Sequence, residues 1–237
     1  MNRIFKIQLK DVISDSQYFI FFILVILVPI ITLVRFSKSL SDDISGLFLS
    51  SYAFLSLLIA MHMTICSMTV TLVVISDKIA DRCEFLLANG YCIKKLKYNY
   101  ANIINISCLT PILLLIIIFF VYSLIAKNIF VKIYLNPFFL LFIAIIILFS
   151  ISLSRLLTDI CLIVKKLDRL KTIIALCSYS FFFIILIPAN RMKRVSVNEV
   201  MIVFSLVLLI ISVIIFVISK ILSSRINNEK VTLSFKQ

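Results

Sequence analysis

Charged side chains that could take part in chemistry or binding gather in one segment between two long apolar stretches. Residues 77–99 read DKIADRCEFLLANGYCIKKLKYN, which is too charged to lie in lipid. On a helix over 79–88, with about 100° between successive residues, Phe85 lies in the middle of a polar face formed by Asp81, Arg82 and Glu84. An exposed aromatic side chain ringed by charges is typical of an anchor that fills a pocket on a partner protein.

The opposite face of this helix is apolar, and we expect it to rest on the membrane-embedded part of the chain. It comprises Ile79, Ala80, Cys83, Leu86 and Leu87. The alternative is a plain connecting loop in which Phe85 turns back into the membrane interface. The sequence favours a segment with two faces, one for the membrane domain and one for a partner.

Polar side chains within the apolar stretches are almost all uncharged. Thr64, Ser67 and Thr71 share one helical face, where hydroxyl groups either hold helices together or line a path for a solute. We expect His62 to be a hydrogen-bond donor between helices, with a role as a ligand or proton relay as the alternative.

The side chains needed for catalysis are missing. Asp159 follows Arg155 by four residues, which predicts an ion pair on one helix face. The chain has one His, no HExxH sequence and no carboxylate in the core of a predicted span, so we expect no enzyme activity and no metal site. Its two glycines, Gly46 and Gly90, exclude a P-loop, so another chain must bind any ATP. The cysteines have no CxxC spacing, and we expect them to be small apolar fillers.

Helices that cross a membrane must position these residues. The chain has 237 residues, of which 62% are hydrophobic, and a span needs about 20 mostly apolar residues. The backbone must satisfy its own hydrogen bonds in lipid, so the spans are helices. The sequence therefore predicts an all-α membrane protein with six spans, at roughly 18–34, 47–75, 100–126, 137–153, 172–187 and 200–221.

The distribution of Lys and Arg predicts the orientation. The chain carries 24 Lys and Arg against 11 Asp and Glu, a net charge of +13. Most of these cations lie in segments that the six spans place on one side, and the richer side is cytoplasmic. We therefore expect a multi-pass protein of the cell membrane with both termini in the cytoplasm. The charge favours contact with anionic membrane lipid rather than nucleic acid, because no basic stripe alternates with exposed aromatic residues.

This layout divides the chain into three parts. Residues 1–16 form a cytoplasmic helix in the membrane interface, with Phe5, Leu9, Val12 and Ile13 on its apolar face; an ordinary basic flank is the alternative. Residues 17–222 form the six-helix transmembrane domain, with cytoplasmic loops at about 77–99 and 155–171. Residues 223–237 form a cytoplasmic tail.

Prolines mark ends and bends of the predicted spans. Pro29 and Pro111 should kink or loosen the first and third spans, and Pro137 suits the first turn of the fourth. Pro188 ends a fifth span that is barely long enough to cross, so a re-entrant hairpin is an alternative to a full crossing there.

The sequence EFLLANG at Glu84–Gly90, followed by IKKL at Ile93–Leu96, resembles the cytoplasmic loop of ABC-2-type transporter permeases. In that family a Glu-x-Leu-Leu core precedes a turn and a basic segment that leads into the third span. The layout is similar over the whole chain, with an amphipathic lead-in helix, six spans, inside termini and a proline late in the first span. The chain departs from the family at Gly90, where proline is frequent, and at Asn99–Tyr100, where the family has a Gly-Lys pair.

The resemblance implies a half-transporter that pairs with a second permease subunit, identical or different, and with two cytoplasmic ATPase subunits. These ATPase subunits would bind ATP and Mg²⁺, and this chain would bind no cofactor. The loop between the second and third spans would contact the ATPase through Asp81, Arg82, Glu84, Phe85, Leu86, Leu87 and Ala88. A second, smaller contact would involve Asp159, Lys165, Lys166, Asp168 and Arg169.

The resemblance also suggests a cargo. Small permeases of this layout that are rich in Ile, Lys and Asn are similar to those that export, or confer immunity to, antimicrobial peptides. Spans with few buried charges also suit an amphipathic or lipid-like substrate. The rival interpretations are a non-transporting membrane scaffold or sensor that docks a cytoplasmic partner, and a passive channel, which the lack of a charged ring disfavours.

Overall fold

The computed structural model describes residues 3–39, 44–128, 130–164, 196–224 and 226. Within these residues every regular element is helical, which confirms the prediction of an all-α protein for this part of the chain. The helices are α1 (Arg3–Ser14), α2 (Ser16–Ser39), α3 (Ile44–Val70), η1 (Thr71–Ile75), α4 (Ser76–Ile79), α5 (Arg82–Ala88), α6 (Ile93–Ala126), α7 (Phe130–Tyr134), α8 (Pro137–Ile163) and α10 (Val197–Ser224).

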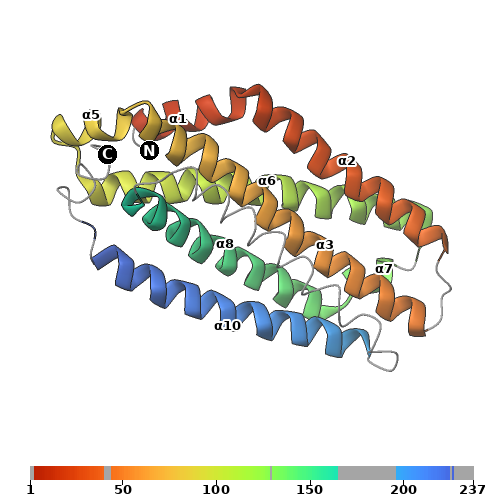
Figure 1. Cartoon of the computed structure of the whole chain (residues 1–237). Helices are drawn as coiled ribbons and strands as arrows, with labels where there is room; N and C mark the ends of the chain where they lie inside the picture. The colour runs from red at the N-terminus through yellow and green to blue at the C-terminus, as the bar shows by residue number, and fades with distance from the viewer. Residues whose placement is uncertain (1–2, 40–43, 129, 165–195, 225, 227–237) are drawn as a thin grey trace.

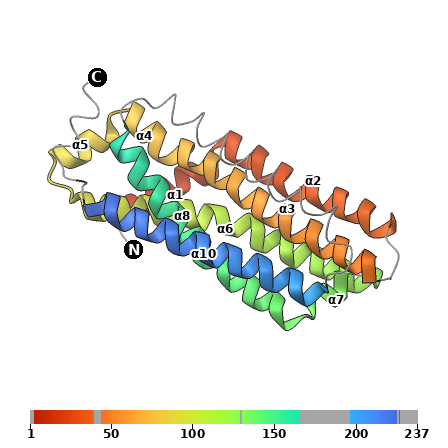
Figure 2. The same ribbon diagram turned by 60° about the horizontal axis from the view of Figure 1, so that its bottom comes forward.

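The long helices lie side by side along an elongated bundle, in which α2, α3, α6 and α8 alternate in direction and α10 runs in the same direction as α8 (Figures 1 and 2). One end of this bundle carries α1, α4 and α5, together with the start of α6 and the ends of α8 and α10; we call it the α5 end. The opposite end carries α7, and we call it the α7 end. Residues far apart in sequence therefore meet at the α5 end.

Four helical segments are long and apolar enough to cross a membrane. They are Leu49–Ile79, which joins α3, η1 and α4, and then α6, α8 and α10. The pair α1–α2, bent by 65°, is a fifth candidate. The predicted span at 172–187 lies outside the described residues, as does Pro188. By length and composition, these four or five helical segments have the character of membrane spans.

The corner between α1 and α2 is made by Asp15. Its carboxylate accepts hydrogen bonds from the backbone N–H groups of Gln17 (2.8 Å) and Tyr18 (3.2 Å), as an N-cap residue does. This cap provides hydrogen-bond acceptors for two backbone N–H groups in the first turn of α2, so the chain can change direction there.

The apolar face predicted for α1 is correct except at its last turn. Phe5 and Val12 are buried, and Leu9 packs against the core. Ile13 is instead 58% exposed, because the chain turns away by 65° directly after α1. α1 is thus docked on the bundle through its first three turns.

Aromatic side chains close the bundle towards the α7 end. The ring of Phe54, fully buried on α3, lies within 6.0 Å, centroid to centroid, of four other rings. These are the rings of Phe119 on α6, Phe130 and Tyr134 on α7, and Phe139 on α8. Such tilted and edge-to-face contacts add stability beyond area burial, and here they join four helices.

The second long span is not a uniform α-helix. Between α3 and α4 the five residues of η1 form a π-helix with i→i+5 hydrogen bonds. By contrast, α2 and α6 continue through Pro29 and Pro111. Pro137 begins α8 as predicted, with the Asn136 side chain capping that helix. The irregular turn lies just before Asp77 and Lys78, where the charged segment begins.

Candidate functional site

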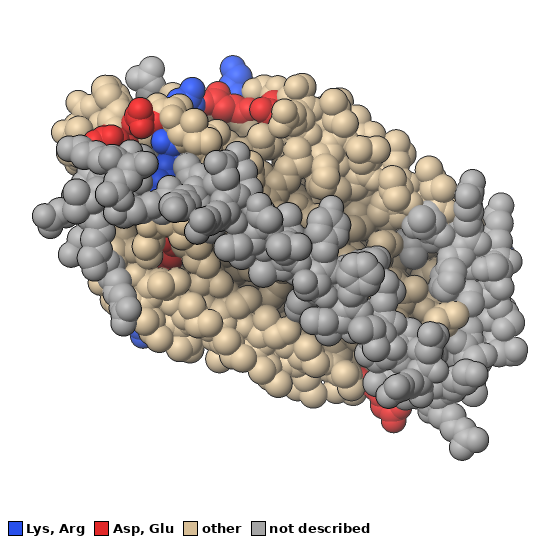
Figure 3. Space-filling model, in the orientation of Figure 1, with Lys and Arg blue, Asp and Glu red and all other residues tan. Residues whose placement is uncertain are grey.

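Charged groups gather at the α5 end of the molecule. On the face drawn in Figure 3, most of the coloured Lys, Arg, Asp and Glu atoms lie there, and the described atoms visible along the middle of the bundle belong mostly to other residue types. Within the described residues, no group of three His, Cys, Asp or Glu side chains could hold a metal ion. The α5 end is therefore a candidate binding site.

Helix α5 carries the surface that the sequence marks for a partner. Phe85 is 68% exposed; Arg82 is exposed and Glu84 is half-buried beside it. On the opposite side of α5, Cys83 and Leu87 are buried. The exposed ring of Phe85 and the buried Cys83 and Leu87 give α5 two different faces, as expected for these three residues.

The predicted start of this helix is wrong. α4 ends at Ile79, and Asp81 adopts a left-handed conformation (φ 54°) before α5 begins. A left-handed residue interrupts a right-handed helix, so the residues before Asp81 do not share the buried face of α5. Ile79 and Ala80 are therefore exposed, Ile79 by 62%, instead of resting on the membrane domain.

The end of α5 is set by Gly90. Its backbone has φ +79°, a conformation that glycine adopts without strain. The N–H of Tyr91 donates to the carbonyl of Leu86 (2.9 Å), and that of Gly90 to the carbonyl of Leu87 (3.1 Å), which is the Schellman pattern. Leu86 packs against the core as predicted, and Ala88 is exposed.

A buried carboxylate lies next to α5. Asp77 accepts hydrogen bonds from Nε2 of Gln8 on α1 (2.8 Å), Oη of Tyr100 on α6 (2.9 Å) and Nη1 of Arg82 on α5 (3.4 Å). Asp77 itself is 6% exposed, and a buried charge requires such donors to offset its lost hydration. One side chain of α4 thus connects three other helices.

Two further contacts extend this set of interactions. We call the connected residues the Asp77 network; they are Gln8, Asp11, Asp77, Arg82, Cys83 and Tyr100. The Arg82 guanidinium lies 3.9 Å from the Asp11 carboxylate on α1. The Tyr100 hydroxyl lies 3.1 Å from the Cys83 sulfur. Arg82 therefore bridges two carboxylates of its own chain, in addition to flanking Phe85.

The next residue, Lys78, ties α4 to a fourth helix. Its Nζ donates to the backbone carbonyls of Cys161 (3.1 Å) and Val164 (2.6 Å) at the end of α8. The last carbonyls of a helix lack partners within it and carry partial negative charge, so the ammonium group satisfies them. Neither Asp77 nor Lys78 was predicted as a site residue, although a charged pair at the end of a long apolar run is a signal that the sequence contains.

Asp159 has a different partner from the one predicted. Its carboxylate lies 2.6 Å from Nζ of Lys97 on α6 and accepts a hydrogen bond from the Ser219 hydroxyl on α10 (2.9 Å). Arg155, the predicted partner, is exposed. Asp159 is 2% exposed, so it joins three helices inside the bundle. The other residues of the predicted second contact, Lys165, Lys166, Asp168 and Arg169, lie outside the described part of the chain.

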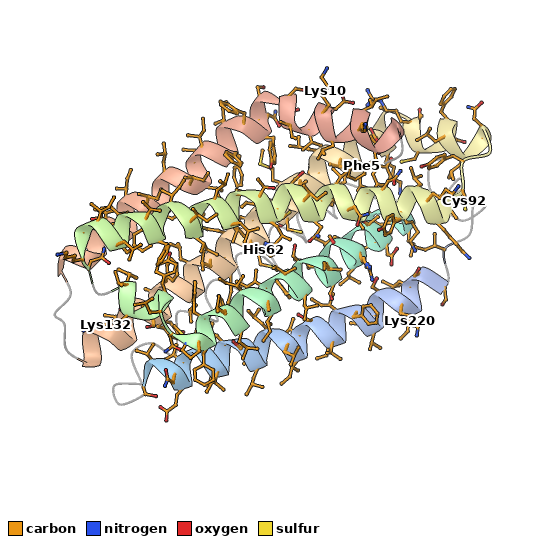
Figure 4. The ribbon with its side chains drawn as sticks, turned by 180° about the vertical axis from the view of Figure 1, so that it is seen from behind. Phe5, Lys10, His62, Cys92, Lys132 and Lys220 are labelled. Atoms are coloured by element: carbon orange, nitrogen blue, oxygen red, sulfur yellow. The ribbon has the colours of Figure 1, made fainter. Side chains whose placement is uncertain are left out.

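The polar residues of the second span behave differently from one another. Thr64, Ser67 and Thr71 are half-buried, and each hydroxyl donates to a carbonyl of its own helix. The expectation of an interhelical bond from His62 is wrong: neither ring nitrogen has a partner among the described residues. The ring is buried mid-bundle, 5.8 Å from that of Phe149 (Figure 4).

The cysteines near α5 have opposite environments. Burial raises the pKa of the Cys83 thiol to about 11. Cys92 is exposed at the start of α6, where the backbone N–H groups of Lys94 and Lys95 lower its pKa. Cys92 is therefore not the apolar filler that the sequence predicted.

Comparison with known proteins gave no match among protein families, curated proteins or solved structures. The geometry of the α5 end is therefore the best guide to what the molecule does.

Proposed function

We propose that this chain is the membrane-spanning permease subunit of an ABC-2-type transporter, driven by a separate cytoplasmic ATPase and working as an exporter. The observation that carries the proposal is the exposed ring of Phe85 on α5, in a segment that resembles the ATPase-contacting loop of that family. An aromatic side chain with charged neighbours is a frequent hot spot of protein interfaces. The proposed contact surface is the exposed side of α5, with Arg82 and Glu84 at its edge.

The Asp77 network supports the proposal because it connects α5 to the spans. A push on α5 would reach α6 through the contact between Cys83 and Tyr100 (3.1 Å). It would reach the second span through the hydrogen bond from Arg82 to Asp77 (3.4 Å). Hydrogen-bond networks that join rigid helices are physical carriers of such coupling. ATP and Mg²⁺ belong to the ATPase in this proposal.

Further partners complete the proposed transporter. A second permease subunit, identical or different, would pair with this one, and an exposed apolar helix face suits either that subunit or lipid. α10 has such a face, formed by Val203, Leu206, Ile210, Val213 and Ile214 among others. An amphipathic cargo, such as an antimicrobial peptide or a lipid-like molecule, fits spans with a largely apolar surface.

The test is co-purification of the full chain with a P-loop ATPase that has no spans of its own and is encoded beside it. Phe85→Asp should weaken ATPase binding by about 30-fold, which corresponds to a hot-spot loss of about 2 kcal/mol. Leu135→Asp is the matched control, because Leu135 is a 72% exposed apolar residue that follows α7 at the opposite end. Equal ATPase binding by wild type and Phe85→Asp would refute the anchor.

A cargo assay separates the permease from its rival, a scaffold or sensor. Cells that lack the gene should become more sensitive to an amphipathic peptide, and Phe85→Asp should not restore protection. Unchanged peptide sensitivity, together with a non-ATPase partner captured through Phe85, would support the scaffold instead.

A further inference from the structure

We propose that the bundle binds the phosphate headgroup of an anionic phospholipid at its α5 end, between α6, α8 and α10. An open cavity of about 950 Å³ lies there, and we call it the headgroup cavity. Its charged and hydrogen-bonding lining includes Lys94, Lys97, Arg155, Asp159, Ser219 and Lys220. This site is distinct from the α5 surface proposed for the ATPase.

The charge of the headgroup cavity is strongly positive. Its described lining has four cationic side chains and one carboxylate, that of Asp159. This carboxylate is already paired with Lys97 at 2.6 Å and bonded to Ser219. Lys94, Arg155 and Lys220 are exposed, and none of them forms an ion pair within the described residues. An excess of unpaired cations in a hollow selects an anion.

The donor types favour a phosphate group. Arg155 offers a planar fork that matches two phosphate oxygens, and Lys94 and Lys220 add point charges. The exposed hydroxyl of Ser223 also lines the cavity and accepts from Lys97, so its own O–H can donate a further hydrogen bond. The buried Lys97–Asp159 pair forms the fixed floor of this arrangement.

Apolar walls select a lipid over a soluble phosphate. Phe216 lines the cavity and is 46% exposed. Val213 and Leu209 lie three and seven residues earlier on α10, so they continue the same face along the span, and both are exposed. The cavity adjoins the last turns of α10 and the first turns of α6, at the depth where headgroups meet the ends of spans. Basic pockets between spans bind lipid headgroups in this way. The exposed face formed by Leu209, Val213 and Phe216 on α10 offers a surface for an acyl chain.

The experiment titrates the purified full chain in detergent and counts bound lipid by native mass spectrometry. Phosphatidylglycerol should bind with a saturable stoichiometry, and phosphatidylcholine with the same acyl chains should bind more weakly. Arg155→Gln with Lys220→Gln should weaken phosphatidylglycerol binding by about fivefold for each cation removed. Both residues are exposed, and equal unfolding temperatures of variant and wild type confirm that folding is unaffected.

Two control variants each remove one positive charge outside the headgroup cavity. Lys95→Gln changes an exposed lysine of α6 that does not line the cavity, and Lys132→Gln changes one on α7 at the opposite end (Figure 4). Both should retain wild-type affinity. Equal weakening by these controls would overturn the proposal, since it would show general attraction to positive charge.

The source of the phosphate is tested in the same titration. Glycerol 3-phosphate and inorganic phosphate should compete only weakly with the lipid. Competition at equal affinity would overturn the lipid assignment, and no preference for phosphatidylglycerol over phosphatidylcholine would overturn the site. Because the chain is tested without an ATPase, the result does not depend on the proposed transporter function.

Discussion

At the scale of single residues, the thiols of Cys83 and Cys92 are close in sequence but differ in their environment and in their expected reactivity. Burial raises the pKa of the Cys83 thiol to about 11. The thiol of Cys92 is exposed, and the N–H groups of Lys94 and Lys95 lower its pKa by stabilising the thiolate. Because the thiolate is the nucleophile, the two sites should react with alkylating reagents at very different rates.

We predict that iodoacetamide modifies Cys92 of the folded chain first and Cys83 only after unfolding. A lowered pKa moves the rise in thiolate to lower pH, so the Cys92 rate should reach half its maximum below the pH of an ordinary thiol. Peptide mass spectrometry over a pH series measures both rates. Cys92→Ser is the control, and unchanged total labelling of that variant would contradict the prediction.

The exposure of the α5 side chains could be predicted from the sequence, because it depends on positions within one helix. The exposed Phe85 and the buried Cys83 and Leu87 follow from helical periodicity alone. Asp77 accepts from Gln8 and Tyr100, which no local pattern connects to it. Contacts of that kind depend on how the helices pack, which the chain's periodicity does not encode.

At the scale of elements, α1 is held on the bundle by one buried hydrogen bond and a short apolar face. Phe5 points into the bundle and Lys10 points away from it (Figure 4). The amide of Gln8 donates to the buried carboxylate of Asp77 at 2.8 Å. Hydrogen bonds to charged groups contribute about 1.5–3 kcal/mol each, so this contact is a large share of what holds α1.

Gln8→Leu should therefore loosen α1 while leaving the spans in place. We expect amide hydrogen exchange in α1 to become roughly tenfold faster or more, in line with the loss of a charged hydrogen bond. Lys10→Gln is the control, since that side chain is exposed. Exchange in α1 that is the same in both variants would show that the Asp77 network does not hold this helix.

Element boundaries separate what sequence could predict from what it could not. The long apolar helices and the start of α8 at Pro137 follow from composition and local chemistry. The break at Asp81 and the π-helix η1 do not, because backbone conformations of single residues are set by the contacts on either side. The prediction of a continuous helix over 79–88 failed for that reason.

At the scale of the whole molecule, the described segments that connect the spans lie at the two ends of the bundle. Cys92 lies at the α5 end (Figure 4), and Leu135 follows α7 at the opposite end. The excess of Lys and Arg on the side of α5 predicts that this end is cytoplasmic.

A membrane-impermeant maleimide tests this orientation. Leu135→Cys in a Cys92→Ser background should react in intact cells, because residue 135 is 72% exposed and lies at the α7 end, which is the outer end in the predicted orientation. The native Cys92 should react only after the membrane is permeabilised. The reverse order of labelling would invert the assigned topology and the side on which an ATPase could bind.

The π-helix η1 has a consequence for insertions and deletions. A π turn absorbs one extra residue, so the helix beyond it keeps the phase of a regular α-helix that is one residue shorter. Deleting Thr71 should therefore regularise the span and leave Asp77 and Lys78 facing Gln8, Tyr100 and the end of α8. Deleting Ala60 should instead turn residues 61–70 by about 100° and expose their buried side. The measurement is the yield of folded protein for each deletion in detergent, which should be higher for the Thr71 deletion. In the half of the second span next to the α5 end, the register of the helix therefore decides which contacts form, more than its composition does.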